Sequence, residues 1–384
     1  MLRRGDRGPA VADIKDALAS LSLLAASPEE DRRFAEFDIA TDRAVRSFQQ
    51  LRGLIVDGVV GPVTVRSLTD ARWKLGDRSL AYTLSAVMTG DDVMALQTRL
   101  AELGYNTGRP DGIFGPLTDQ CVREFQRHRG LDEDGVFGAG TYRELNRIGR
   151  MVTGGRPQYL REHQLIQKAG PRLQGKRIVV DPAHGGGDPG WQHGSVRASD
   201  LVLDIAERLR SRMQTAGMTV FLTRDENSNP SPEDRAEMAN TLGADLLLSL
   251  HIDGSPSPQA CGIATFHFGT DSGATSTVGE SLAALVQREL VSRTRFIDCR
   301  VHHRPWDILR LTRMPAVQVE MGYLSNAYER TQLLNDDFRN RLADGLLVAV
   351  KRLYLDGRDD PHTGTFSFSD LLAHERMIHN AAAR

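Results

Sequence analysis

Two histidines and one glutamate stand at the ends of apolar segments in the C-terminal half of the chain. His184 follows the segment IVVDPA, His251 closes LLLSL, and Glu320 closes VQV. A lone histidine in such a place is most often a satisfied polar residue. Imidazole nitrogens and a carboxylate that gather at one place can instead bind a ligand, so we predict that the three side chains share one functional site.

The segments around these residues alternate between short apolar runs and longer amphipathic runs. The short runs predict strands from Ile178 and at 219–223, 245–251, 262–268 and 316–320. The longer runs predict helices at 201–216, 233–242, 278–294 and 337–354. This alternation predicts an α/β domain with a mainly parallel, twisted sheet covered by helices on both faces. Sites in such sheets lie beyond the carboxyl ends of the strands, where the three side chains are expected.

The N-terminal part contains an internal repeat. The segment AVRSFQQLRGLIVDGVVGPVTVRSL recurs as CVREFQRHRGLDEDGVFGAGTYREL, so that Phe48-Gln49 matches Phe125-Gln126 and Asp57-Gly58 matches Asp134-Gly135. Apolar residues at helical spacing predict three short helices in each repeat, at 1–75 and 80–150. Three threonines are predicted as helix N-caps, namely Thr64, Thr118 and Thr141.

Composition narrows the class of protein. The chain has 384 residues, of which 40% are hydrophobic and 26% charged, and its formal net charge is −2. These values argue against nucleic acid or an anionic membrane as the partner and against disorder. Three scattered cysteines are too few for a disulfide framework or a thiolate metal site. Without an apolar export signal or a membrane-length apolar segment, we expect a cytoplasmic chain with no membrane insertion.

The motifs resemble two known families. The repeats resemble the peptidoglycan-binding type 1 domain. The motifs DPAHGG, LTR, SLHID and VEMGYLSN resemble the zinc N-acetylmuramoyl-L-alanine amidases of the amidase type 3 family. This resemblance implies cleavage of the amide between N-acetylmuramic acid and L-alanine, with His184 and His251 as zinc ligands and Glu320 as general base. It divides the chain into the two repeats, a linker at 151–174, an amidase domain at 175–356 and a tail at 357–384.

The sequence departs from the family at one ligand. The family's third zinc ligand is acidic, and its position falls on Ala198, whose methyl group cannot bind a metal. His193, Asp200 and Asp253 are the candidate substitutes, although His193 can equally be an exposed loop histidine. The expected cofactor is zinc if the site is competent, and otherwise none.

Two functions follow from this departure. The first is a weakly active or inactive regulator of cell-wall synthesis, whose partners are peptidoglycan fragments or precursors and cell-wall synthesis proteins. The order of two repeats, a ligand-poor amidase domain and a tail resembles that of an actinobacterial group of amidase-like proteins. The alternative is an active zinc amidase. Arg224 and Arg235 can contact a substrate carboxylate or make structural ion pairs, and both interpretations stay open.

The C-terminal tail is rich in hydroxyl groups. Thr363 and Thr365 lie in an extended run where phosphorylation would add charge, and they are the candidate phosphorylation sites. Ser369 is predicted to cap a short helix that follows. The alternative interpretation is a tail that packs on its own domain.

Overall fold

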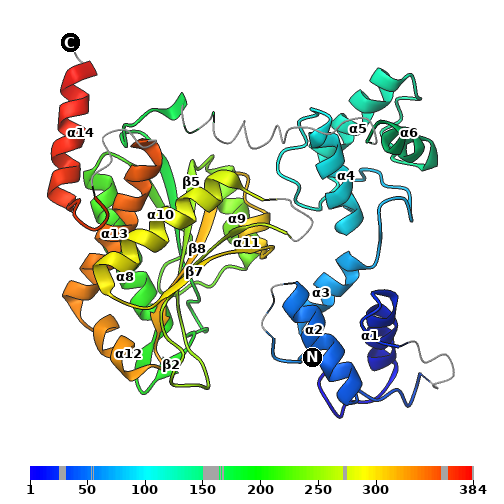
Figure 1. Cartoon of the computed structure of the whole chain (residues 1–384), viewed down its shortest axis with the longest axis horizontal. Helices are drawn as coiled ribbons and strands as arrows, with labels where there is room; N and C mark the ends of the chain where they lie inside the picture. Colours follow the sequence, from blue (N-terminus) through cyan, green and yellow to red (C-terminus); the bar gives the residue numbers. More distant parts are fainter. Residues whose placement is uncertain are drawn as a thin grey trace. The chain divides into compact units, whose positions relative to one another are not determined.

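The computed structural model divides into two compact units, Met1–Gln158 and Tyr159–Arg384. It describes residues 1–25, 32–52, 54, 56–149, 164, 166, 168–270, 275–355 and 362–382. Most of the predicted linker lies outside these residues. Each unit is described by itself (Figure 1).

The N-terminal unit consists of two helical repeats, as the sequence predicts. The six helices are α1 (Pro9–Ser20), α2 (Ile39–Leu51), α3 (Pro62–Ala71), α4 (Asp91–Glu102), α5 (Pro116–Arg129) and α6 (Ala139–Gly149). Each repeat has its own apolar core, in which Phe48 and Phe125 are almost fully buried. A salt bridge of 2.9 Å between Arg52 and Asp91 links the two repeats.

The recurring glutamine holds the turn that follows its helix. In the second repeat the Gln126 side-chain amide donates to Asp134 Oδ1 at 2.7 Å and to the Val136 carbonyl at 3.0 Å. Its side-chain oxygen accepts from the Gly135 amide at 2.9 Å. Gln49 makes the corresponding bonds in the first repeat. The repeated residues are therefore explained by folding, because a buried amide satisfies polar groups that the turn would otherwise bury without partners.

The prediction that the threonines are N-caps is wrong where the structure assigns the cap. Gly61 caps α3 and Gly115 caps α5, each followed by a proline at the first helical position. Proline favours that position because its fixed φ suits a helix start. Thr118 lies in the first turn instead, and its hydroxyl accepts from the Gln97 side chain at 3.0 Å.

Replacing Gln126 with leucine should destabilise the N-terminal unit by about 1–3 kcal/mol, because the Gly135 amide would stay buried without its acceptor. Gln120 lies exposed on the same helix, so Gln120→Leu is the matched control and should change the free energy of unfolding by less than about 0.5 kcal/mol. Urea denaturation followed by circular dichroism measures both values. Equal stability of the two variants would show that the glutamine network contributes nothing.

The C-terminal unit is built around a six-stranded sheet. Its strands are β1 (Arg177–Pro182), β4 (Thr219–Leu222), β5 (Leu246–Asp253), β6 (Ile263–Phe268), β7 (Asp298–Arg304) and β8 (Ala316–Tyr323). The order is β4-β1-β5-β8-β6-β7. The first four strands in this order are parallel, β6 is antiparallel to β8, and β7 is parallel to β6. The predicted mainly parallel sheet is confirmed, with β7 as an additional edge strand.

Helices cover both faces of this sheet (Figure 1). The larger core lies under α8 (Ala198–Thr215), α10 (Thr277–Thr294) and α13 (Asp336–Leu355), and the smaller core under α9 (Pro232–Thr241) and α11 (Asp307–Arg310). A hairpin of β2 (Gln192–His193) and β3 (Val196–Arg197) precedes α8, while α12 (Ala327–Leu333) and α14 (Phe368–Ala382) complete the unit. None of the helices in the described residues has the length and apolar character needed to cross a membrane.

Candidate functional site

The structure brings His184, His251 and Glu320 to one edge of the sheet. His251 on β5 is the register partner of Glu320 on β8, and its Nδ1 lies 3.8 Å from Glu320 Oε1. His184 follows β1, and its ring centroid lies 6.0 Å from that of His251. The carboxyl ends of the parallel strands β1, β5 and β8 thus gather the three side chains, as the strand pattern predicts.

A tight loop of 184–190 orients His184. The residue has φ 61°, a left-handed conformation that is uncommon outside glycine, although histidine adopts it more often than most residues do. Its Nδ1 lies 2.8 Å from Asp188 Oδ2. Gly190 packs on the other side of the ring, since a Cβ there would lie 2.6 Å from His184 Cδ2. The carboxylate fixes the tautomer and leaves Nε2 of His184 directed away from Asp188, an arrangement typical of ligating histidines.

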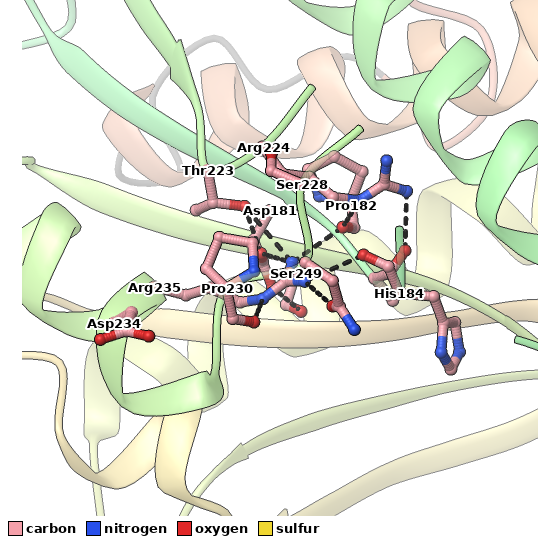
Figure 2. Close-up of polar contacts among 12 residues, drawn as sticks. Asp181, Pro182, His184, Thr223, Arg224, Ser228, Pro230, Asp234, Arg235 and Ser249 are labelled. Carbon is pink, nitrogen blue, oxygen red and sulfur yellow. Dashed lines mark hydrogen bonds and ion pairs between the residues drawn. The ribbon is translucent and has the colours of Figure 1, made fainter. Parts of the chain in front are cut away.

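Asp181 and Arg235 form a buried ion pair beneath this loop (Figure 2). Arg235 Nη1 lies 2.6 Å from Asp181 Oδ1, and Asp181 Oδ2 accepts from the Ser249 hydroxyl at 2.6 Å. Arg235 Nη2 also donates to the His184 carbonyl at 2.9 Å. Burial by itself would raise the pKa of Asp181, but the Arg235 guanidinium and the hydroxyls lower it below its usual range. The pair therefore stays charged and fixes the backbone at His184.

Arg224 supports the same loop through main-chain carbonyls. Its guanidinium donates to Pro182 and Ala183 at 2.8 Å each and to Ser199 at 2.9 Å. The three acceptors come from the end of β1 and the start of α8, so Arg224 ties these two elements together. The structure thus favours the structural interpretation of both arginines over contact with a substrate carboxylate.

The environment shifts the titration of the two remaining site groups. Burial lowers the pKa of His251 to about 4. Burial, with a further contribution from Asp253, raises the pKa of Glu320 to about 8. Glu320 Oε1 accepts from Gln318 at 3.0 Å, whereas Oε2 is buried with no hydrogen-bond partner in the described part of the chain. A neutral imidazole can accept a hydrogen bond from the N–H of an uncharged amide, and a protonated carboxyl can donate one to the amide carbonyl.

Ala198 is the residue that we predicted at the position of the family's acidic ligand. It is the first residue of α8, it is fully buried, and it belongs to the larger apolar core. Its amide donates to the Trp191 carbonyl at 2.9 Å. The Trp191 indole packs on Gly254, where a Cβ would lie 1.9 Å from the ring. Position 198 therefore offers a methyl group inside the apolar core and no donor atom for a metal.

The donor set does not fit a catalytic zinc ion, which needs three protein ligands and one open position. Among the residues that the structure describes, no group of three His, Cys, Asp or Glu side chains could hold a metal ion. Of the candidate substitutes, His193 is exposed on β2, and Asp200 and Asp253 are also exposed. The sequence analysis did not identify Asp188 or Gln318. The signal for Asp188 was a carboxylate four residues after His184, and the signal for Gln318 was an amide two residues before Glu320.

The tail packs on its own domain, as the alternative interpretation predicts. The buried residues Phe366 and Leu371 join the larger core, and Glu375 pairs with the buried Lys351 of α13. Burial lowers the pKa of Lys351, while Glu375 opposes that shift. The predicted cap at Ser369 is wrong: the Ser367 hydroxyl accepts from the Asp370 amide at 3.2 Å.

Replacing Glu375 with alanine should release α14, because Lys351 would then be buried without its carboxylate partner. Limited proteolysis should cut the C-terminus several times faster than in the wild-type chain. Arg376→Ala changes an exposed charge on the same helix and should leave the rate unchanged. Equal rates for both variants would contradict this role of the ion pair.

Comparison with known proteins gives the class. The family model for N-acetylmuramoyl-L-alanine amidase matches residues 178–352, and that for the peptidoglycan-binding domain matches 7–68 and 89–145. The chain is 46% identical, over 99% of its length and 96% of the relative's, to N-acetylmuramoyl-L-alanine amidase CwlM of Mycobacterium tuberculosis. The chain therefore belongs to the N-acetylmuramoyl-L-alanine amidase family and carries peptidoglycan-binding domains.

Two further similarities cover about half of the chain. A germination-specific N-acetylmuramoyl-L-alanine amidase of Bacillus subtilis is 27% identical over 49% of this chain and 84% of its own. The solved N-acetylmuramoyl-L-alanine amidase of Clostridium difficile 630 is 29% identical over 48% of this chain and 99% of its own, with a TM-score of 0.45.

Proposed function

We propose that this chain is a cytoplasmic regulator of cell-wall synthesis that recognises peptidoglycan fragments or precursors and hydrolyses their amide bond weakly or not at all. Its repeats and its amidase domain both supply peptidoglycan recognition, and cell-wall synthesis proteins are its proposed partners. The observation that carries the proposal is that no group of three His, Cys, Asp or Glu side chains in the described residues could hold a metal ion, while the predicted third ligand position holds the buried, apolar Ala198.

The geometry around Ala198 supports recognition without efficient hydrolysis. The loop of 184–190 and the two strand-end residues His251 and Glu320 are held in place by polar contacts that are buried or partly buried. A preformed site of this kind can bind the amide that an active family member would cut. Without a third ligand the affinity for zinc should be low. Even the loss of a residue that only hydrogen-bonds to a metal ligand typically lowers metal affinity about 10–100-fold.

A regulator also needs a part that can be modified, and we propose Thr363 and Thr365 of the tail for phosphorylation. Thr365 is exposed, and its hydroxyl donates to the His362 carbonyl at 2.7 Å. The same carbonyl accepts from Arg352 at 3.0 Å. A phosphate on Thr365 would remove the first bond and place negative charge near this arginine, which would change how the tail packs.

The second candidate function is an active zinc amidase, which the name of the M. tuberculosis relative favours. It requires His184 and His251 as ligands, Glu320 as general base and a substitute third ligand such as His193. His193 lies on a two-residue strand of an exposed hairpin and joins no group of three potential metal ligands among the described residues, so the hairpin would have to move to bring this imidazole to the metal.

Incubation of the full chain with a defined muropeptide, at micromolar zinc, separates the two functions. We expect binding, measured by calorimetry, and no release of the L-alanine-linked peptide, measured by mass spectrometry. If the peptide is released by the wild type and by His193→Ala but not by Glu320→Gln, the chain is an active amidase in which His193 has no role, and the proposal is overturned. Release lost in both variants would establish the second function as stated above.

A further inference from the structure

The sheet face that carries the candidate site continues across two more strands. Register pairs place five side chains in one row across this face, namely Asp181 of β1, Ser249 of β5, Gln318 of β8, Phe266 of β6 and His302 of β7. Residues paired in register point to the same side of a sheet. The face on which His251 and Glu320 lie therefore extends to the sheet edge at β7.

On this extension three rings pack together, and we call Phe266, His302 and Trp306 the ring platform. The Phe266 and His302 rings are stacked, with centroids 5.5 Å apart and an interplanar angle of 28°. The Phe266 and Trp306 centroids are 4.7 Å apart. All three side chains are partly exposed. Phe266 and Trp306 also pack against the smaller apolar core, so the ring platform is an edge of that core that stays partly open to solvent. Aromatic rings that are half apolar and half exposed are common at binding surfaces.

The backbone holds the ring platform in place. His302 Nε2 donates to the Cys299 carbonyl at 2.7 Å, which fixes the imidazole parallel to Phe266. The Trp306 carbonyl accepts from the amides of Leu309 and Arg310 in α11, at 2.9 and 2.8 Å, and these bonds fix the backbone that carries the Trp306 ring. The rings are thus positioned before any ligand arrives, which reduces the entropic cost of binding.

The ring platform begins next to Glu320. Ala264 of β6 is the register partner of Glu320, and Phe266 follows two residues later on the same face. Diagonal neighbours of this kind lie roughly 7–8 Å apart across an antiparallel pair. This separation is about the size of one sugar ring. If the amide of a ligand lies at Glu320, the chemical group bonded to that amide therefore reaches the ring platform. The Arg304 guanidinium, 5.7 Å from the Phe266 centroid, adds a cation at the border of the platform.

We propose that the ring platform binds the sugar rings of peptidoglycan, with the stem peptide extending toward the loop of 184–190. This inference rests on the proposed recognition of muropeptides and adds the direction in which they lie. A pyranose ring offers flat faces of C–H groups that pack on aromatic π-faces, while its hydroxyl and acetamido groups can accept hydrogen bonds from Arg304. A stem peptide has no comparable flat apolar face, so the sugar is the better fit.

Two probes and three variants of the full chain test this inference. The probes are a disaccharide dipeptide, N-acetylglucosaminyl-N-acetylmuramyl-L-alanyl-D-isoglutamine, and a free stem tetrapeptide. The variants are Trp306→Ala, His302→Ala and, as matched control, His303→Ala, whose side chain belongs to the opposite face of β7 because successive strand residues alternate. Circular dichroism establishes whether each variant is folded. If Trp306→Ala is not folded, His302→Ala alone tests the ring platform.

We expect the disaccharide dipeptide, and not the tetrapeptide, to slow amide hydrogen exchange in residues 298–306 of the wild-type chain. His302→Ala and Trp306→Ala should abolish this protection and weaken the amidase-domain affinity for the disaccharide dipeptide at least tenfold, while His303→Ala should match the wild type. Protection elsewhere only, or equal protection in His302→Ala, would overturn the sugar-binding inference and leave the proposed function standing. Failure of the wild-type chain to bind either probe would overturn both.

Discussion

Replacing Ala198 with glutamate should raise the zinc affinity of the full chain at least tenfold. The substitution places an acidic oxygen at the predicted third ligand position, where it would join two histidines whose ring centroids lie 6.0 Å apart. Ala198 is fully buried, so the new carboxylate should lower the unfolding temperature in the presence of chelator. Zinc should then stabilise the variant but not the wild-type chain, since a ligand that binds only the folded state raises its stability.

Two further variants make this expectation specific. Ala198→Gln adds the same volume without a charged oxygen and should gain little zinc affinity. Adding His184→Ala to Ala198→Glu should remove the gain, because one imidazole ligand is lost. If Ala198→Glu leaves zinc affinity and the zinc-dependent unfolding temperature unchanged, position 198 does not correspond to the family's ligand.

Replacing Asp181 with alanine should lower the free energy of unfolding of the amidase domain by roughly 3–5 kcal/mol, because Arg235 would be left buried without its counter-ion. Removal of Asp200, which is exposed on α8, is the matched control and should cost less than about 0.5 kcal/mol. Urea denaturation followed by the fluorescence of the tryptophans in this domain measures the loss. A loss below about 1 kcal/mol would contradict the structural role of the pair.

A double-mutant cycle and the pH dependence test the same ion pair independently. Asp181→Ala combined with Arg235→Met should lose less than the sum of the single losses, with a coupling of about 0.5–3 kcal/mol. The folded pKa of Asp181 is lowered, so its contribution should be complete above the ordinary aspartate pKa. It should disappear as the pH falls through the lowered folded pKa. An additive cycle, or a contribution that is lost above neutral pH, would argue against the pair.

The hydrophobic pattern predicted most of the sheet, because four of its strands are mostly buried and the edge strand β4 is also apolar. It missed β7, which reads DCRVHHR. This strand lies at the sheet edge, where charged and polar side chains protect against pairing with other chains. It therefore lacks the run of apolar residues by which the other strands were predicted. The wrong cap at Ser369 has a similar local cause. Ser367 and Asp370 exchange hydrogen bonds and start the helix two residues earlier than the sequence pattern suggested.

The site could be predicted at its strand ends but not in its supporting shell. His251 and Glu320 close apolar strands, and parallel topology alone brings such residues to one edge. The roles of Arg224 and Arg235 depend on main-chain carbonyls of the His184 loop, which no sequence pattern specifies. The ring platform also escaped prediction, because it requires the register of β6 against β7.

Zinc stoichiometry tests the central claim most directly. The full chain, purified without chelator and equilibrated with micromolar zinc, should contain far less than one zinc per chain by elemental analysis, and His184→Ala should leave that content unchanged. One zinc per chain in the wild type, lost in His184→Ala, would show that another donor completes the ligand set and would contradict the account.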